Sequence, residues 1–158
     1  MISIEWFAGF FDGEGCINLS ASGARSQVCL RLMLVNTDLD LLERIQLEFG
    51  GKLRVKVHKG RQAHWKDSGC LKWTGVEALA LVNRLAPHLL LKQRQALLAR
   101  EFYEFRRRPL VEKCTSVYDR IGNHHYKLTE ASKDIELGFK QRMHELNRRG
   151  KPDAHRSY

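Results

Sequence analysis

The chain has 158 residues, of which 43% are hydrophobic and 28% are charged, so it is long enough to bury the core of one ordinary domain. Lysine and arginine outnumber aspartate and glutamate by 27 to 18, which gives a formal net charge of +9. This surplus favours an anionic partner, usually nucleic acid, and the composition excludes a disordered tail. No apolar run approaches the ~18 residues of a membrane span, and no secretory leader or lipidation motif is recognisable. We therefore expect an intracellular protein without a membrane partner.

The N-terminal segment predicts a helix that Ser3 caps and that runs to about Gly13. Gly9 and Gly13 stand four residues apart among aromatic residues, so they share one face of this helix. A glycine inside a helix costs about 1 kcal/mol relative to alanine. Two at this spacing suggest that another backbone comes very close, and the carboxylates of Asp12 and Glu14 follow at the end of that face.

Alternating apolar and polar residues predict strands at 16–22 and 27–35, joined by a turn at 23–26 as a β-hairpin with one apolar face. Asn36 or Thr37 caps a second helix, which Gly50 ends. Residues 52–58 alternate most regularly and give the clearest strand prediction. A fourth strand is expected within 64–74, where the register around residues 67–69 is unclear.

Three helices are expected in the second half of the chain, at about 76–86, 91–108 and 130–149, with Pro87 and Pro109 ending the first two. Leu98, Phe102 and Phe105 form the core stripe of the second, and the third has one apolar side made of Ile135, Phe139, Met143 and Leu146. We expect an α+β domain at 1–149, with a core at 2–105, helices within 110–149 and a loose tail at 150–158.

The cysteines and paired histidines show no metal-binding spacing. Because there is no Cys-x-x-Cys pair, we expect buried thiols in a reducing compartment at four positions, Cys16, Cys29, Cys70 and Cys114. His124 and His125 are expected in a polar loop.

The polar face of the four-stranded sheet is unusually basic. We expect it to carry Asn18, Ser20, Ser22, Gln27, Arg31, Lys52, Arg54, Lys56 and His58. Side chains on one face of a strand recur about every 6.6 Å, and DNA advances about 3.4 Å per base pair, so one residue faces every second base pair. These residue types also hydrogen-bond base edges in the major groove. The face is therefore a candidate DNA-binding surface, and the alternative is a solvated sheet face.

Residues Phe7 to Gly15 read Phe-Ala-Gly-Phe-Phe-Asp-Gly-Glu-Gly. This stretch resembles the signature of the LAGLIDADG homing endonucleases, Leu-Ala-Gly-Leu-Ile-Asp-Ala-Asp-Gly, without a gap. The expected order of elements, αββαββα with a four-stranded antiparallel sheet, is also the repeating unit of that family. The resemblance thus covers about residues 2–105, with a single copy of the signature and extra C-terminal helices.

The resemblance implies a set of active-site residues. In the family, the last acid of the signature and the carbonyl before it bind the metal, which gives Glu14 and Gly13 here, while the other acid, Asp12, is more structural. Residues 87–95 resemble the family segment Pro-x-Leu-x-x-Lys-Gln, which places Lys92 at the active site. Asn36 occupies the place of a glutamine that organises active-site water. It is shorter by one methylene, so either the water network adapts or Asn36 only caps its helix.

The resemblance also implies a homodimer packed through the first helix, with Phe7, Gly9, Phe10, Asp12 and Gly13 at the interface. Such enzymes use Mg²⁺, for which Ca²⁺ or Mn²⁺ can substitute, to cut both strands of a long, near-palindromic site in double-stranded DNA. They are typically encoded in mobile introns or inteins, which implies bacterial cytoplasm or the matrix of a chloroplast or mitochondrion. The alternatives are a catalytically inactive maturase or DNA-binding regulator of the same fold, and a basic RNA-binding module.

Overall fold

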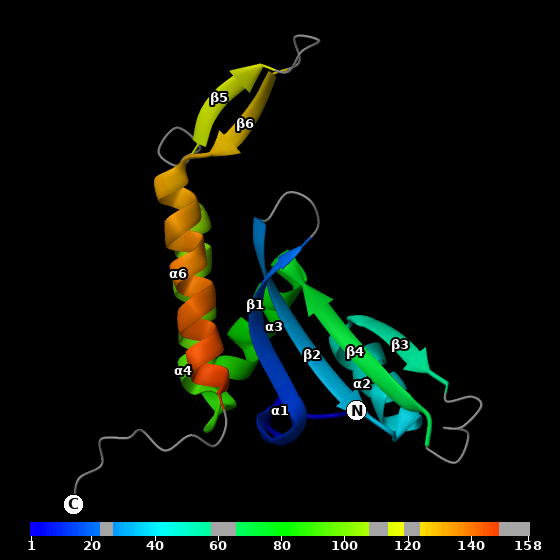
Figure 1. Cartoon of the computed structure of the whole chain (residues 1–158). Helices are drawn as coiled ribbons and strands as arrows, with labels where there is room; N and C mark the ends of the chain where they lie inside the picture. Colours follow the sequence, from blue (N-terminus) through cyan, green and yellow to red (C-terminus); the bar gives the residue numbers. More distant parts are fainter. Residues whose placement is uncertain (23–26, 58–65, 108–113, 119–123, 149–158) are drawn as a thin grey trace, which may run out of the picture.

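The computed structural model describes residues 1–22, 27–57, 66–107, 114–118 and 124–148. Four antiparallel strands form the main sheet in the order β1-β2-β4-β3, and helices cover one of its faces (Figure 1). The elements up to the third helix follow the predicted order: α1 (Ile4–Glu14), β1 (Gly15–Ser22), β2 (Gln27–Asn36), α2 (Leu39–Phe49), β3 (Lys52–Lys56), β4 (Ser68–Thr74) and α3 (Gly75–Leu85). The α+β class and the αββαββα order are therefore confirmed.

The C-terminal part differs from the prediction of helices alone. A short 3₁₀ turn, η2 (Ala86–His88), leads to α4 (Gln93–Arg107), and a two-stranded hairpin of β5 (Cys114–Tyr118) and β6 (His124–Leu128) precedes α6 (Glu130–Asn147). In Figure 1 this hairpin stands beyond the N-terminal end of α6. The paired histidines thus begin a strand instead of lying in a loop. Aromatic and β-branched residues such as Val117, Tyr118 and Tyr126 favour strands, which the helical interpretation overlooked.

Local hydrogen bonds explain where the first two helices begin. Ser3 caps α1 as predicted, because its hydroxyl accepts a hydrogen bond from the N–H of Trp6 at 3.2 Å. The N-cap of α2 is Asp38, not Asn36 or Thr37, and its carboxylate accepts from the N–H of Leu41 at 2.9 Å. An aspartate at this position accepts a hydrogen bond from an otherwise unpaired helix N–H, and its negative charge interacts favourably with the positive end of the helix dipole.

The core lies between the inner face of the sheet and the helices. Phe7 of α1 is fully buried, with its ring 4.4 Å from that of Phe49 and 6.1 Å from that of Trp73. The indole N–H of Trp73 donates to the carbonyl of Phe49 at 2.9 Å, so the largest buried side chain has its polar group paired. The predicted stripe of α4 is confirmed, since its members are nearly or fully buried: Leu98, Phe102 and Phe105.

Two predictions of burial and the end of one predicted strand were wrong. On α6, Ile135 is 44% exposed, whereas the neighbouring Glu136 is only 3% exposed. The four cysteines are half-buried instead of buried, and three of them lie on strands of the main sheet. The strand predicted at 52–58 ends at Lys56 and forms the edge of the sheet, where Val55 and Val57 are about half exposed.

The tail predicted at 150–158 lies outside the described residues. Within the part of the chain that the structure describes, no helix combines the length and apolarity needed to cross a bilayer.

Candidate functional site

The C-terminal end of α1 presents oxygen atoms to solvent. Glu14 is the last residue of this helix, and both Gly13 and Glu14 are exposed. The last carbonyls of a helix have no intrahelical partners and carry the negative end of the helix dipole, which attracts cations. A carboxylate and main-chain oxygens are also the hard ligands that Mg²⁺ and Ca²⁺ prefer. In the described residues, no three His, Cys, Asp or Glu side chains gather as a metal site. The exposed acid at this helix end is Glu14.

Asp12 attaches the segment before α4 to this helix end. Its carboxylate accepts three main-chain hydrogen bonds, from the N–H groups of Leu90 at 2.6 Å, Leu91 at 3.0 Å and Lys92 at 3.0 Å. The Lys92 ammonium in turn donates to the main-chain carbonyl of Asp12. Both side chains are buried, at 6% exposure each. These contacts bring the Lys92 ammonium to the C-terminal end of α1, at a carbonyl two residues before Glu14.

Asn36 is the last residue of β2, and this end of β2 lies beside the first residues of β1. Gly15, which follows Glu14, pairs with Leu34, two residues before Asn36. The Asn36 side-chain oxygen accepts a hydrogen bond from the N–H of Asp38 at 2.9 Å, which is a local turn ahead of α2. Asn36 is therefore not the cap of α2, which is Asp38, and its role in an active-site water network stays a prediction.

The outer face of α1 is apolar and open. Trp6 is 48% exposed and stacks on Phe10, with ring centroids 5.2 Å apart and an interplanar angle of 16°. A Cβ atom added to Gly9 or Gly13 would meet nothing within 4 Å, so packing inside the subunit does not require glycine at either position. The two glycines therefore have room for a second backbone to approach.

Phe7 and Asp12, which we expected at a subunit interface, occupy the opposite side of α1. Phe7 is fully buried in the core, and Asp12 is taken up by its three hydrogen bonds. Their side chains are therefore not available to a second subunit. The sequence interpretation missed Trp6 on the open face, although it lies three residues before Gly9 and helical spacing could have identified it.

The outward face of the sheet gathers the predicted basic residues. Asn18 pairs with Arg31, Arg54 pairs with Cys70, and Lys52 pairs with Lys72, which the sequence interpretation missed. Lys72 alternates with the buried Leu71 and Trp73, and this alternation was the available signal. Lys52, Arg54 and Lys56 are exposed, and Arg31 and Lys72 are partly so.

No aspartate or glutamate occurs in any of the four strands of the main sheet, β1 to β4. The positive charge of the outward face is therefore not neutralised from within the sheet. A face of this kind suits the phosphate backbone of a nucleic acid.

Three of the predicted DNA-contacting residues fit less directly. The hydroxyl of Ser20 is buried and has no hydrogen-bond partner among the described residues, so it is less open than predicted. The side chains of Ser22 and Gln27, and the whole of His58, lie outside the part of the structure that is described.

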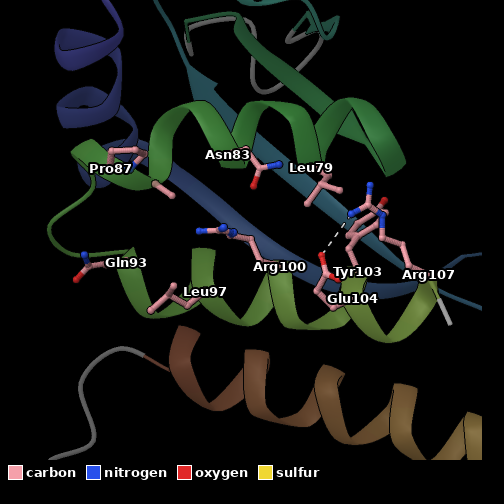
Figure 2. A pocket seen from close by; sticks show the side chains of 10 residues that line it. Leu79, Asn83, Pro87, Gln93, Leu97, Arg100, Tyr103, Glu104 and Arg107 are labelled. Atoms are coloured by element: carbon pink, nitrogen blue, oxygen red, sulfur yellow. Dashed lines mark ion pairs between the residues drawn. The ribbon is translucent and has the colours of Figure 1, made fainter.

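A groove of about 630 Å³ lies between α3 and α4 (Figure 2). Arg100 extends between the two helices there, and Glu104 forms an ion pair with Arg107 at 3.6 Å. None of the predicted site residues lines this groove. A duplex is bound on an open surface and needs no enclosed pocket, so the sheet and the end of α1 remain the candidate site.

Comparisons with known proteins agree with this arrangement. The family model described as LAGLIDADG endonuclease matches residues 7–74, from the nonapeptide to the end of β4. A search of curated proteins finds no match.

Several solved structures share the fold. The homing endonuclease I-CvuI in complex with its target has 20% identity and a TM-score of 0.60, with 94% of this chain and 83% of that chain covered. The archaeal intron-encoded homing endonuclease I-Vdi141I complexed with DNA has 14% identity and a TM-score of 0.65, with 95% and 87% covered. The LAGLIDADG meganuclease I-AabMI bound to uncleaved DNA has 17% identity and a TM-score of 0.60, and the match covers 88% of this chain but 44% of that chain.

The chain therefore has the fold of the LAGLIDADG homing endonucleases. The resemblance seen in the nonapeptide is confirmed, and this chain carries a single copy of the LAGLIDADG motif, at the helix end that holds Glu14.

Proposed function

We propose that the protein is a site-specific DNA endonuclease that acts as a homodimer and cuts both strands of a long, near-palindromic site. The observation that carries this proposal is the placement of Glu14 and Lys92 at one helix end, beside a basic sheet face without acids. The family match and the neighbours solved with DNA support it.

The open face of α1 supports the dimer. Gly9 and Gly13 would let the same helix of a second subunit approach closely, and the stacked rings of Trp6 and Phe10 would be covered. Exposed leucines at 90 and 91, at 87% and 75% exposure, add apolar surface near this helix end. I-AabMI is more than twice as long as the matched region, which leaves room for two such units in one chain. A symmetric dimer of this chain would read two similar half-sites.

The donor atoms at the end of α1 fit a divalent metal ion. Glu14 from each subunit and the adjacent Gly13 carbonyl would hold it, and Mg²⁺ is the ion we propose, with Ca²⁺ or Mn²⁺ as substitutes. I-CvuI was solved in the presence of Ca and of Mg. A bound ion of this type activates water and stabilises the leaving oxygen. Lys92 brings a positive charge to the same place, where it would stabilise the negative charge that develops on the phosphate.

A selection of duplexes tests this function. Bound sequences are recovered from a randomised library in Ca²⁺, then exposed to Mg²⁺, and the ends produced are mapped for the wild type and for Glu14→Gln. We expect both proteins to bind a near-palindromic consensus and only the wild type to cut it. Glu5→Gln is the matched control, because Glu5 is an exposed acid in the first turn of the same helix and should not affect cleavage.

The other outcomes point to different functions. A consensus that the wild type binds but does not cut would favour the inactive regulator or maturase. A preference for structured RNA over duplex DNA would favour the RNA-binding module. Loss of binding together with cleavage in Glu14→Gln would make Glu14 a structural residue.

A further inference from the structure

The first four of the ten residues of β2 extend beyond the rest of the sheet as part of a two-stranded ribbon. β4 pairs with β2 only from Arg31 to Asn36, so residues 27–30 pair with β1 alone. β1 begins at Gly15, directly after Glu14, and ends at Ser22. The seven residue steps between its ends, at about 3.3 Å each, place Ser22 about 23 Å from Gly15. That length corresponds to about seven base pairs of DNA. In the proposed complex, this ribbon would therefore contact the outer base pairs of each half-site.

Two charged side chains bind the main chain of this ribbon at one residue. The N–H of Val28 donates to Glu136 of α6 at 3.2 Å, and its carbonyl accepts from Arg106 of α4 at 2.7 Å. The guanidinium and the carboxylate are 3.4 Å apart. Because the N–H and C=O of one strand residue point to the same side, both groups of Val28 face away from β1. The pair thus occupies the place that a third strand would take.

The two helices that carry this pair, α4 and α6, pack against each other, and α6 makes one further hydrogen bond to β1. Gln95 of α4 donates to the carbonyl of Leu146 on α6 at 3.1 Å, and the rings of Phe102 and Phe139 are 5.7 Å apart. On β1, two residues before the ribbon begins, Asn147 of α6 donates to the carbonyl of Ile17 at 2.8 Å. The two helices therefore hold the ribbon through Val28 and hold β1 just below it through Ile17.

The hydrogen bonds between Val28 and the Arg106–Glu136 pair are suited to holding the ribbon in one position. Hydrogen bonds are directional, so a donor and an acceptor on one residue fix its place and orientation, whereas an apolar contact lets a strand slide. Glu136 is 3% exposed, and burying such a charge is costly unless it is paired. An isolated two-stranded hairpin is only marginally stable in water, so its geometry depends on such support.

We propose that Arg106 and Glu136 are positioning residues that set the angle of the β1–β2 ribbon and thereby control specificity at the outer base pairs of each half-site. The proposal rests on the proposed function, because it requires that the outward face of the sheet binds a duplex.

The test replaces the pair by apolar residues in the variant Arg106→Met/Glu136→Leu. Exchanging an ion pair for apolar residues of similar size is often neutral for stability, but this exchange also removes the partners of the Val28 main-chain groups, so the Tm is measured to check that the fold is retained. Relative binding in Ca²⁺ is then measured for every single-base substitution across the selected site. We expect discrimination at the outer base pairs to fall about fivefold or more, as for the loss of a specific base contact, with no change at the inner positions.

The matched control is Glu101→Gln/Arg142→Gln. This ion pair, 3.0 Å long and about half exposed, joins the same two helices. It should leave the specificity profile of the wild type unchanged. Glu136→Gln keeps an acceptor for Val28 and should retain more of the outer discrimination than the double variant, and it carries the comparison if the double variant does not fold.

A uniform loss of affinity at all positions, or an unchanged profile in a folded double variant, would overturn the positioning role. The result for the wild-type protein shows whether the positioning role alone fails or the proposed function fails as well. If the wild type selects no duplex at all, the nuclease proposal fails and the positioning role fails with it.

Discussion

At the scale of single residues, the two acids of the nonapeptide have different surroundings. Glu14 is exposed, whereas Asp12 is buried and accepts three main-chain N–H groups. We predict that Asp12→Ala lowers the free energy of unfolding by about 3 kcal/mol, since several hydrogen bonds to a charged acceptor are lost together. Urea unfolding measures this change. A variant that loses cleavage at unchanged stability would instead assign Asp12 to the chemistry.

Gly9 provides a second test at this scale. Alanine should stabilise the isolated subunit by about 0.5–1 kcal/mol, because the helix interior prefers it and no atom lies within 4 Å of the added Cβ. The same substitution should weaken the dimer, which analytical ultracentrifugation detects. Gly138→Ala in α6, where the Cβ also meets nothing within 4 Å, is the control and should leave dimerisation unchanged. A Gly9→Ala variant with an unweakened dimer would contradict close packing through α1.

At the scale of elements, the pair between α4 and α6 should show strong coupling. Arg106→Met alone leaves the buried Glu136 without its guanidinium and should cost about 3–5 kcal/mol, more than Arg106→Met/Glu136→Leu. A double-mutant cycle by chemical unfolding measures the coupling. Equal and additive effects of the two single substitutions would show that the pair is not coupled.

Periodicity predicted most elements but not this contact. The alternation in β1 and β2 and the stripe of α4 were visible in the sequence, because each depends on neighbours within the same element. In α6 the predicted stripe holds for Phe139, Met143 and Leu146, but Ile135 is exposed and Glu136 beside it is buried. A buried glutamate depends on a partner in another helix, Arg106, and on a main-chain N–H in a distant strand, Val28. No local pattern encodes those two groups.

The same reasoning applies to the candidate site. The nonapeptide and the segment before α4 predicted Glu14 and Lys92 as site residues. The structure brings the Lys92 ammonium to the helix end that carries Glu14, and their catalytic roles stay predictions. Which side of α1 faces the core required the fold, so Phe7 was misplaced. Trp6 and Lys72 were missed although their spacing in the sequence was available, because neither residue belongs to the motif or to the strand whose alternation was clearest.

At the scale of the whole molecule, charge is divided between the two faces of the sheet. The four strands contain no acid, and the acids of the described part lie on helices and connections. We predict that Lys72→Ala weakens DNA binding about equally for all sequences. It should also reduce the slope of log K against log salt concentration by about 1 per subunit. Lys133→Ala, whose lysine pairs with Glu130 on α6, should leave the slope unchanged. Equal slopes for the wild type and Lys72→Ala would remove Lys72 from the interface.

The bonds from Val28 and Ile17 to the last two long helices limit how far this protein can be shortened for use as a compact DNA-targeting tool. The match to the family model ends at residue 74. A fragment cut there would lack Arg106, Glu136 and Asn147, and the main-chain groups that they bind would face solvent at the open edges of a two-stranded ribbon. Unpaired strand edges of this kind promote aggregation. A shortened derivative should therefore keep the chain through Asn147, the last residue of α6, and should not end at the boundary of the recognisable motif.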